Sequence, residues 1–321
     1  MAKRHLIRLF LIGSLGLMAT ATAFATEYIL PAKGDAVIGS NQMTTVKKDD
    51  SLSMLAERND AGYYELLEAN PSLDPLRLKE GTQVLVPHQI ILPDAPREGI
   101  VVNLAELRLY YYPPGSNKVI IYPVGIGRLG NQWMTPTGQL SIIEKQKDPD
   151  WHVPESVIAD MAKRGVKVPE VVPAGPTNPL GAYMMRLSNE DYLIHGTDHA
   201  RTIGRRTTGG CISLYPEDIA RLFSMVPLDT KVTIVNQPFK AGWLKGQLYF
   251  EAHRPLREER FRYAGHYDSL WNEALNNAIA KHTASIDWNT VQTLVKNETG
   301  VAEVVWPVAV VAATPAQPAA G

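Results

Sequence analysis

Short runs in which hydrophobic and polar residues alternate fill the middle of the chain. Between residues 106 and 112, Leu107, Leu109 and Tyr111 occupy every second position, which is the period of a β-strand. Similar runs lie at 100–104, 119–124, 139–143, 182–187, 191–195 and 231–235. Within this stretch, a helical period appears at 216–226, and a further helix is possible at Glu155–Gly165. Many short strands at this spacing predict a mainly β domain over residues 99–236.

A different pattern precedes this domain. Residues 43–88 read as a short strand, two helices and a second strand, a small α/β unit of βααβ order. Ser51 is the expected N-cap of the first helix, and Asn70-Pro71 ends the second. Residues 26–42 show little periodicity and carry Pro31 and Gly34, so we expect a linker there.

Two further segments have weaker patterns. Residues 151–179 form a long insertion rich in proline, which is either a binding loop or a surface excursion. Residues 237–321 form a C-terminal extension with one expected strand at Leu248–Glu251 and an amphipathic helix at His266–Lys281. We expect this helix to pack on the β domain. The Ala/Pro-rich end, 312–321, is expected to be disordered.

The first 25 residues have the three parts of a secretory signal peptide. Lys3, Arg4 and Arg8 form the positive region, and an apolar run follows them. Ala23-Phe24-Ala25 is a cleavage site of the small-x-small type. An uncleaved membrane anchor is the alternative, but the apolar run is short for a bilayer span. We therefore expect export, and no membrane span after cleavage.

Composition narrows the class of protein. The chain has 321 residues, of which 45% are hydrophobic and 20% are charged, as in soluble proteins large enough for two domains. The formal net charge is −1, and no basic stripe with interleaved aromatics occurs, which argues against nucleic-acid binding. The chain has one cysteine. In an exported protein such a residue is either an inert buried thiol or a reactive one.

Cys211 and His195 are the candidate catalytic pair. Cys211 follows Gly209-Gly210, which suits a tight turn near a substrate. His195 ends an expected strand. A cysteine attacks carbonyl carbon as a thiolate, and a neighbouring imidazole can take its proton. Backbone amides at the turn can stabilise the resulting oxyanion.

The residues around this pair resemble the L,D-transpeptidases with a YkuD catalytic domain. The resemblance rests on His195-Gly196-Thr197, on Thr208-Gly209-Gly210-Cys211 and on Thr135-Pro136-Thr137-Gly138. It implies a β-sandwich-like catalytic domain that transfers acyl groups of peptidoglycan stem peptides through a cysteine thioester. D-Alanine leaves, and no metal or other cofactor takes part. The acceptor is an amine of a second stem peptide or the C-terminal lysine of an outer-membrane lipoprotein.

The resemblance also implies roles for individual residues. Gly196 orients the His195 ring through its backbone. The oxyanion and the substrate are expected to meet the 208–211 segment, where the Gly209, Gly210 and Cys211 amides and the Thr208 hydroxyl are donors. Arg206 either meets a substrate carboxylate or is a solvated charge, and Tyr183 is a candidate for the acyl-donor pocket. The 151–179 insertion corresponds to a lid.

Residues 43–88 resemble a LysM domain, with Ala69-Asn70-Pro71 in the middle and Val84-Leu85-Val86-Pro87 at the end. The resemblance implies binding to glycan that contains N-acetylglucosamine; a docking module without a ligand is the alternative. Asp49 stands where the family commonly has glycine. Exported members with this domain order are periplasmic proteins of Gram-negative bacteria, so we expect that location.

Two departures from the family pattern leave rival functions open. Gly209 stands where many members have histidine, and Ser213 stands where many have arginine. Arg205 or Arg206 could replace the missing cation. The rivals are a cysteine hydrolase, which resolves the thioester with water, and a wall-binding protein without activity. A zinc site at His195, Asp198, His199 and Cys211 is disfavoured, because the i, i+4 histidine spacing serves a metal only on a helix.

Overall fold

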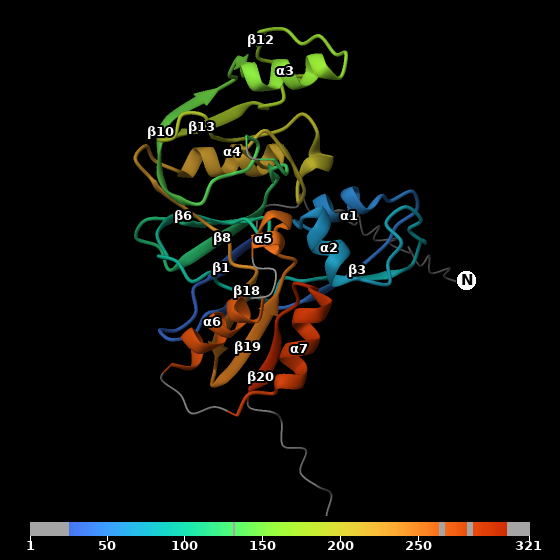
Figure 1. Ribbon diagram of the computed structural model, residues 1–321, viewed down its shortest axis with the longest axis vertical. Coiled ribbons are helices and arrows are strands. Elements are labelled where there is room, and N and C mark those ends of the chain that lie inside the picture. The colour runs from blue at the N-terminus through green and yellow to red at the C-terminus, as the bar shows by residue number, and fades with distance from the viewer. Residues whose placement is uncertain (1–25, 131, 263–266, 281–284, 307–321) are drawn as a thin grey trace, which may run out of the picture.

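The computed structural model describes residues 26–130, 132–262, 267–280 and 285–306. The expected signal peptide and the Ala/Pro-rich end lie outside these residues. Across the described ranges the chain has more strand than helix, and none of its helices is long and apolar enough to cross a membrane. In Figure 1 the insertion lies at the top, the LysM-like unit at one side and the C-terminal unit at the bottom.

Nine strands form one mixed sheet in the order β1-β8-β7-β6-β17-β10-β13-β14-β16 (Figure 1). Their bounds are β1 (Thr26–Ile29), β6 (Gly99–Asn103), β7 (Arg108–Tyr112), β8 (Lys118–Pro123), β10 (Gly138–Lys147), β13 (Tyr183–Leu187), β14 (Leu193–His195), β16 (Ile212–Ser213) and β17 (Lys231–Val235). The pairs β6–β17 and β14–β16 are parallel, and the other neighbours are antiparallel.

Both faces of this sheet are buried along β6 and β7. Tyr111 points into the core under α4 (Pro216–Met225), and its neighbour Tyr110 points into a second core on the opposite face, against Ile90. The prediction of a mainly β domain is therefore confirmed in this coarse form. The sequence predicts a sandwich-like arrangement, whereas the structure has one curled sheet. A small parallel pair of β9 (Ile126–Gly127) and β15 (Arg206–Thr208) lies beside it.

Residues 43–88 contain the elements that their pattern indicates: α1 (Leu52–Arg58) and α2 (Tyr63–Ala69) between β3 (Gln42–Thr45) and β4 (Gln83–Val86). The Met54 backbone N–H donates to Ser51 Oγ at 3.2 Å, the expected cap. Asp49 has a φ of 62°, in the left-handed region that favours glycine. The turn thus keeps the conformation to which glycine is best suited.

The segment 26–42 is not a linker. β1 pairs with β8 at the edge of the large sheet, and β2 (Val37–Ile38) pairs with β5 (Ile90–Ile91). Only one side of β1 is partly covered, and Ile29 remains 72% exposed. An edge strand of this kind has little hydrophobic alternation, which explains why the sequence pattern missed it.

The C-terminal extension is a folded unit with its own core. Its sheet is antiparallel and comprises β18 (Phe239–Leu244), β19 (Gln247–Ala252) and β20 (Glu303–Trp306). Its helices are α5 (Arg257–Arg262), α6 (Tyr267–Ile279) and α7 (Trp288–Asn297). The expected strand and amphipathic helix are both present, as β19 and α6. However, α6 packs its apolar face on this sheet and not on the catalytic domain, because Leu270, Ala274 and Leu275 belong to the core of the C-terminal unit.

A buried ion network joins the three parts of the molecule. Arg108 of β7 donates to Glu65 of α2 at 2.7 Å, to Glu106 at 3.1 Å and to Glu251 of β19 at 3.4 Å. Lys240 of β18 pairs with Glu106 at 2.9 Å and with Glu251 at 3.4 Å. These charges therefore fix the LysM-like unit and the C-terminal unit against the catalytic domain.

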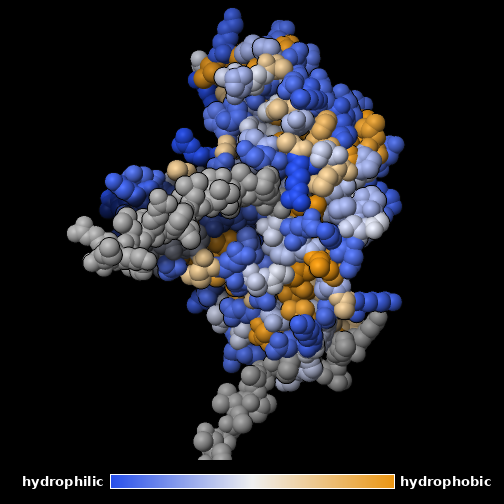
Figure 2. Space-filling view, turned by 180° about the vertical axis from the view of Figure 1, so that it is seen from behind, coloured by the Kyte–Doolittle hydropathy of each residue, from blue (hydrophilic) through white to orange (hydrophobic). Residues whose placement is uncertain are grey.

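The surface seen in Figure 2 carries its hydrophobic residues in small separate groups among hydrophilic ones. The exposed large hydrophobic side chains include Leu76, Met43 and Leu228, which lie far apart in the sequence. Scattered residues of this kind are normal on a soluble protein and do not by themselves mark an interface.

Candidate active site

The parallel pair of β14 and β16 brings His195 and Cys211 together. Ile194 lies opposite Ile212, and His195 lies opposite Ser213. The Leu214 N–H donates to the His195 carbonyl at 2.9 Å. Cys211 comes one residue before β16, two positions from the partner of His195. Since side chains two apart on a strand share a face, we expect the thiol and the imidazole to emerge on the same side of the sheet.

His195 is held in one orientation by the residue that follows it. Its Nδ1 lies 2.6 Å from the Gly196 carbonyl oxygen. A carbonyl only accepts, so Nδ1 carries the hydrogen and Nε2 presents a lone pair. Burial lowers the pKa of His195 to about 4, against the smaller opposing effects of this hydrogen bond and of Asp198. The ring is therefore neutral near pH 7 and able to accept a proton.

Cys211 lies half-buried in an apolar environment. It packs, as Trp151 does, against the buried cluster of Leu180, Met184 and Leu193. Burial raises the pKa of the Cys211 thiol to about 11, although the Arg186 cation acts in the opposite direction. Thiol and imidazole are consequently both neutral in the unliganded protein, so proton transfer must accompany attack on the substrate.

We expect alkylation of Cys211 by iodoacetamide to be slow at about pH 7 and to accelerate about tenfold per pH unit toward pH 10. Only the thiolate reacts, and below the pKa of about 11 its fraction rises tenfold per unit. Mass spectrometry of the single cysteine gives the rate constant at each pH. A plateau at neutral pH would instead reveal a thiolate–imidazolium pair and would contradict this description of the resting site.

Hydroxyl groups fix the loop that carries Cys211. Thr208 Oγ1 donates to the Cys211 carbonyl at 2.6 Å and accepts from the Gly210 N–H at 3.2 Å. Thr135 Oγ1 donates to the Gly210 carbonyl at 2.7 Å. The Thr208 hydroxyl and the Gly210 amide, both predicted to face the oxyanion, are thus directed into the loop itself.

Gly210 is required by the shape of this loop. Its φ is 117°, and a Cβ at this position would lie 2.8 Å from Cε1 of Tyr192. Gly209 differs, because a Cβ there would meet only Trp133 at 3.6 Å and Val157 at 4.0 Å. The position where many family members have histidine therefore has space for a Cβ atom.

The structure does not bring two of the predicted residues to the thiol. Arg206 uses both ends of its guanidinium fork on Glu258, at 2.7 and 2.8 Å, and donates through Nε to the Gly127 carbonyl. The Tyr183 ring packs on Phe223 of α4, with centroids 4.9 Å apart. Side chains alternate along β13, and its neighbour Met184 belongs instead to the apolar cluster against which Cys211 packs.

Ser213 stands where many family members have arginine, and neither Arg205 nor Arg206 supplies the missing cation. Arg205 stacks on the Tyr63 ring at 3.3 Å, and Arg206 is paired with Glu258. Ser213 itself is buried beside Gly125. The cation that lowers the pKa of Cys211 comes from β13, as Arg186. Its position could not be derived from the catalytic motifs.

Sequence reasoning also missed aromatic residues around the loop. Tyr192 borders Gly210, and Trp133 borders Gly209. Arg128 lies over the Trp133 ring at 4.1 Å and pairs with Asp160 at 2.9 Å. Asp160 belongs to α3 (Glu155–Lys163), which lies between β11 (Trp151–His152) and β12 (Val171–Val172) in the insertion. The insertion therefore reaches the rim of the site through this ion pair.

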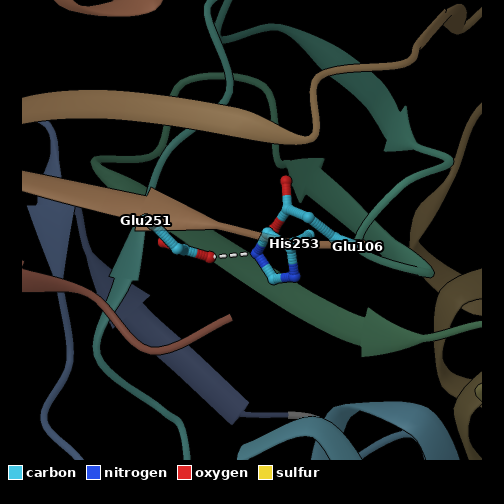
Figure 3. A group of neighbouring side chains, drawn as sticks. All are labelled: Glu106, Glu251 and His253. Carbon is cyan, nitrogen blue, oxygen red and sulfur yellow. Dashed lines mark hydrogen bonds and ion pairs between the residues drawn. The ribbon is translucent and has the colours of Figure 1, made fainter. Parts of the chain in front are cut away.

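A cluster of metal-ligand residue types lies elsewhere, at Glu106, Glu251 and His253 (Figure 3). His253 contacts Glu251, and the ligand atoms of the three residues lie within 4.8 Å of one another. Both carboxylates, however, already pair with Lys240 and Arg108. Cations of the protein thus occupy the positions that a metal would need, and we assign the cluster to the ion network.

Comparisons with known proteins agree with these motifs. The family model of the L,D-transpeptidase catalytic domain (YkuD) matches residues 97–234, and that of the LysM domain matches residues 44–87. A probable L,D-transpeptidase of Escherichia coli K12, YcfS, is 43% identical over 241 residues, which cover 74% of this chain and 75% of the relative. ErfK/SrfK, another from the same organism, is 41% identical over 251 residues, covering 77% and 80%.

Among solved structures, L,D-transpeptidase 3 from Mycobacterium tuberculosis is 14% identical, with a TM-score of 0.32 over 49% of this chain and 76% of that chain. That score is too low to support an argument. The sequence relatives are sufficient, since more than two thirds of each is covered at well over 30% identity. The chain belongs to the L,D-transpeptidase family, with a YkuD catalytic domain and a LysM domain.

Proposed function

We propose that this protein is an exported peptidoglycan L,D-transpeptidase in which Cys211 is the nucleophile and His195 is the general base. The observation that supports the proposal is the register of the β14–β16 pair, in which His195 lies opposite Ser213, two positions from Cys211, together with the hydrogen bond between His195 Nδ1 and the Gly196 carbonyl. Family membership supports the reaction class, and the hydrogen-bonded loop 208–211 supports a preorganised site.

The first half of the reaction forms a thioester. His195 Nε2 takes the thiol proton as Cys211 Sγ attacks the carbonyl carbon at the L-centre of diaminopimelate, the third stem residue. The oxyanion is stabilised by backbone amides of the loop, with those of Gly209 and Cys211 as the candidate donors. When the intermediate collapses, the peptide C–N bond breaks. The proton held by His195 passes to the nitrogen, and D-alanine leaves.

The second half transfers the acyl group. An acceptor amine attacks the thioester carbonyl and loses a proton to His195, and the Cys211 thiol is restored. The acceptor is a diaminopimelate amine of another stem, which gives a 3-3 crosslink, or a lysine of an outer-membrane lipoprotein. The energy of the cleaved D-alanine bond is retained in the thioester, so the reaction needs no cofactor.

The LysM domain directs this chemistry to the wall. We propose that it binds glycan strands in the periplasm, after signal cleavage has released the protein from the membrane. The buried ion pair between Glu65 and Arg108 joins the LysM domain to the catalytic domain. Bound glycan would therefore lie at a fixed distance from Cys211, which favours stem peptides at a defined position along the strand.

A partition experiment tests the proposed transfer. The purified protein is incubated with a disaccharide-tetrapeptide, with and without a second diaminopimelate-containing stem. Transpeptidation predicts release of one D-alanine per crosslinked product and little free tripeptide when the acceptor is saturating. Quantitative release of tripeptide at all acceptor concentrations would contradict it and favour the hydrolase. Thr207→Val serves as the control substitution and should give the same products as the unchanged protein, since Thr207 is exposed and outside the loop hydrogen bonds.

A further inference from the structure

Thr26, the first residue of β1, contacts a carboxylate of the LysM domain. Its hydroxyl donates to Asp60 Oδ2 at 2.8 Å, and its backbone N–H donates to the same carboxylate. Asp60 lies in the turn between α1 and α2, and β1 is the edge strand of the catalytic sheet. This contact thus joins two domains through the backbone nitrogen of Thr26.

The surroundings of Asp60 are rich in negative charge. Asp218 of α4 and Glu65 of α2 both act on its carboxylate. Burial and the Asp218 charge raise the pKa of Asp60 to about 8. A carboxylate in such a place is stabilised by an added cation more than an exposed one would be.

The cationic groups nearby are already in use or neutral. A cavity of about 10 Å³, room for roughly one water molecule, is lined by Asp60, His88, Tyr28, Glu65 and Arg108, among others. Arg108 donates to Glu65, Glu106 and Glu251. Burial lowers the pKa of His88, so that imidazole is neutral near pH 7. Among the described residues, no further Lys or Arg lines this cavity.

The sequence supplies the cation at the required atom. Ala23-Phe24-Ala25 immediately precedes Thr26, so signal cleavage after Ala25 converts the Thr26 amide N–H into an α-ammonium group. We propose that Asp60 is an internal binding site for this ammonium group, formed on processing, which ties β1 and the LysM domain together. The inference rests on the export part of the proposed function and is independent of the catalytic part.

The bond that breaks is the Ala25–Thr26 peptide bond. The hydroxyl of the attacking water joins the Ala25 carbonyl carbon, and its proton together with one from solvent converts the Thr26 nitrogen into an ammonium group. Before cleavage, the nitrogen offers Asp60 one neutral N–H. Afterwards it offers three donors and a full positive charge, and hydrogen bonds between charged partners are roughly twice as strong as neutral ones. Processing therefore strengthens the junction between the domains at the moment when the protein leaves the membrane.

The test compares four proteins. Two have Thr26 as their first residue and two carry one extra glycine before it, and each pair comprises a protein with Asp60 and a protein with Asp60→Asn. Asp49→Asn is the matched control, because Asp49 is an exposed aspartate of the same domain. Reaction of the α-amine with an acetylating N-hydroxysuccinimide ester is followed by mass spectrometry of the N-terminal peptide. We expect the Thr26 amine to react about tenfold more slowly with Asp60 present than in Asp60→Asn, since an ion pair that raises the amine pKa by about one unit lowers the free-amine fraction tenfold.

Urea unfolding gives the second readout. The added glycine should lower the unfolding midpoint when Asp60 is present and leave it unchanged in Asp60→Asn. Equal amine reactivity in Asp60→Asn and Asp49→Asn, or a glycine effect that survives Asp60→Asn, would overturn the inference. N-terminal sequencing of the exported protein must give Thr26, and any other start would also overturn it. D-Alanine release, measured on the same samples, reports separately on the catalytic proposal.

Discussion

Replacement of Cys211 by alanine is expected to abolish acyl transfer while leaving the fold intact. The variant loses the only thiol in the chain and with it the atom that forms the thioester, so the rate of D-alanine release should fall by about 10⁴-fold or more. The side chain is small and half-buried, and the free energy of unfolding should change by less than about 1 kcal/mol. Release assays and urea unfolding measure the two quantities.

A second variant separates chemistry from shape. Cys211→Ser keeps the size of the side chain but supplies a hydroxyl, whose proton is much harder to remove than that of a thiol. It should fold normally and remain nearly as inactive as Cys211→Ala. D-Alanine release at the wild-type rate by either folded variant would show that another group performs the attack.

Replacement of Arg108 by methionine is expected to lower the free energy of unfolding by about 3–5 kcal/mol, which is typical when one partner of a buried ion pair is removed. Arg108 contacts Glu65, Glu106 and Glu251, and its side chain is 2% exposed. Without it, Lys240 would be left as the one Lys or Arg of the described residues that pairs with the buried carboxylates of Glu106 and Glu251.

Lys231→Met is the matched control for Arg108→Met. Lys231 pairs with Glu98 at 2.9 Å, but the two side chains are 70% and 54% exposed. Such a surface pair contributes about 1 kcal/mol at most. Denaturant unfolding of both variants at neutral pH makes the comparison. If Arg108→Met were no less stable than Lys231→Met, the buried network would not be what holds the three parts together.

Local signals in the sequence were sufficient to predict the βααβ unit and most strands of the large sheet. Alternation in 106–112 and the cap at Ser51 are properties of consecutive residues, and tertiary packing agrees with them. Strand β1 could not be predicted in this way. It is short and half-exposed, and its pairing with β8, some ninety residues away, depends on the rest of the sheet being formed.

The candidate site shows the same division. The contact of Gly196 with His195 could be inferred from the motif, because the two residues are adjacent in the chain. The pairing of Arg206 with Glu258 could not, because Glu258 lies 52 residues further along the chain, in α5, where no motif marks it. Motifs likewise do not show which face of β13 is turned toward Cys211. Tyr183 lies on the other face, against Phe223.

Two groups that family motifs suggest as substrate contacts are already bonded within the protein. Arg206 is committed to a carboxylate of the protein, and the Thr208 hydroxyl is committed to the Cys211 carbonyl. A cleft of about 840 Å³ opens beside Arg206, between α2 and residues 253–260. We therefore propose Tyr192 and Trp133, which border Gly210 and Gly209, as substrate contacts in place of the groups that family motifs suggest.

Intact mass spectrometry of the mature protein, incubated with a disaccharide-tetrapeptide and no acceptor, is the measurement to make first. The expected result is a covalent adduct equal in mass to the donor minus D-alanine, located on Cys211 by peptide mapping and discharged on addition of an acceptor amine. Absence of any adduct, together with absence of D-alanine release from a folded protein, would contradict the assignment of Cys211 as the transpeptidase nucleophile.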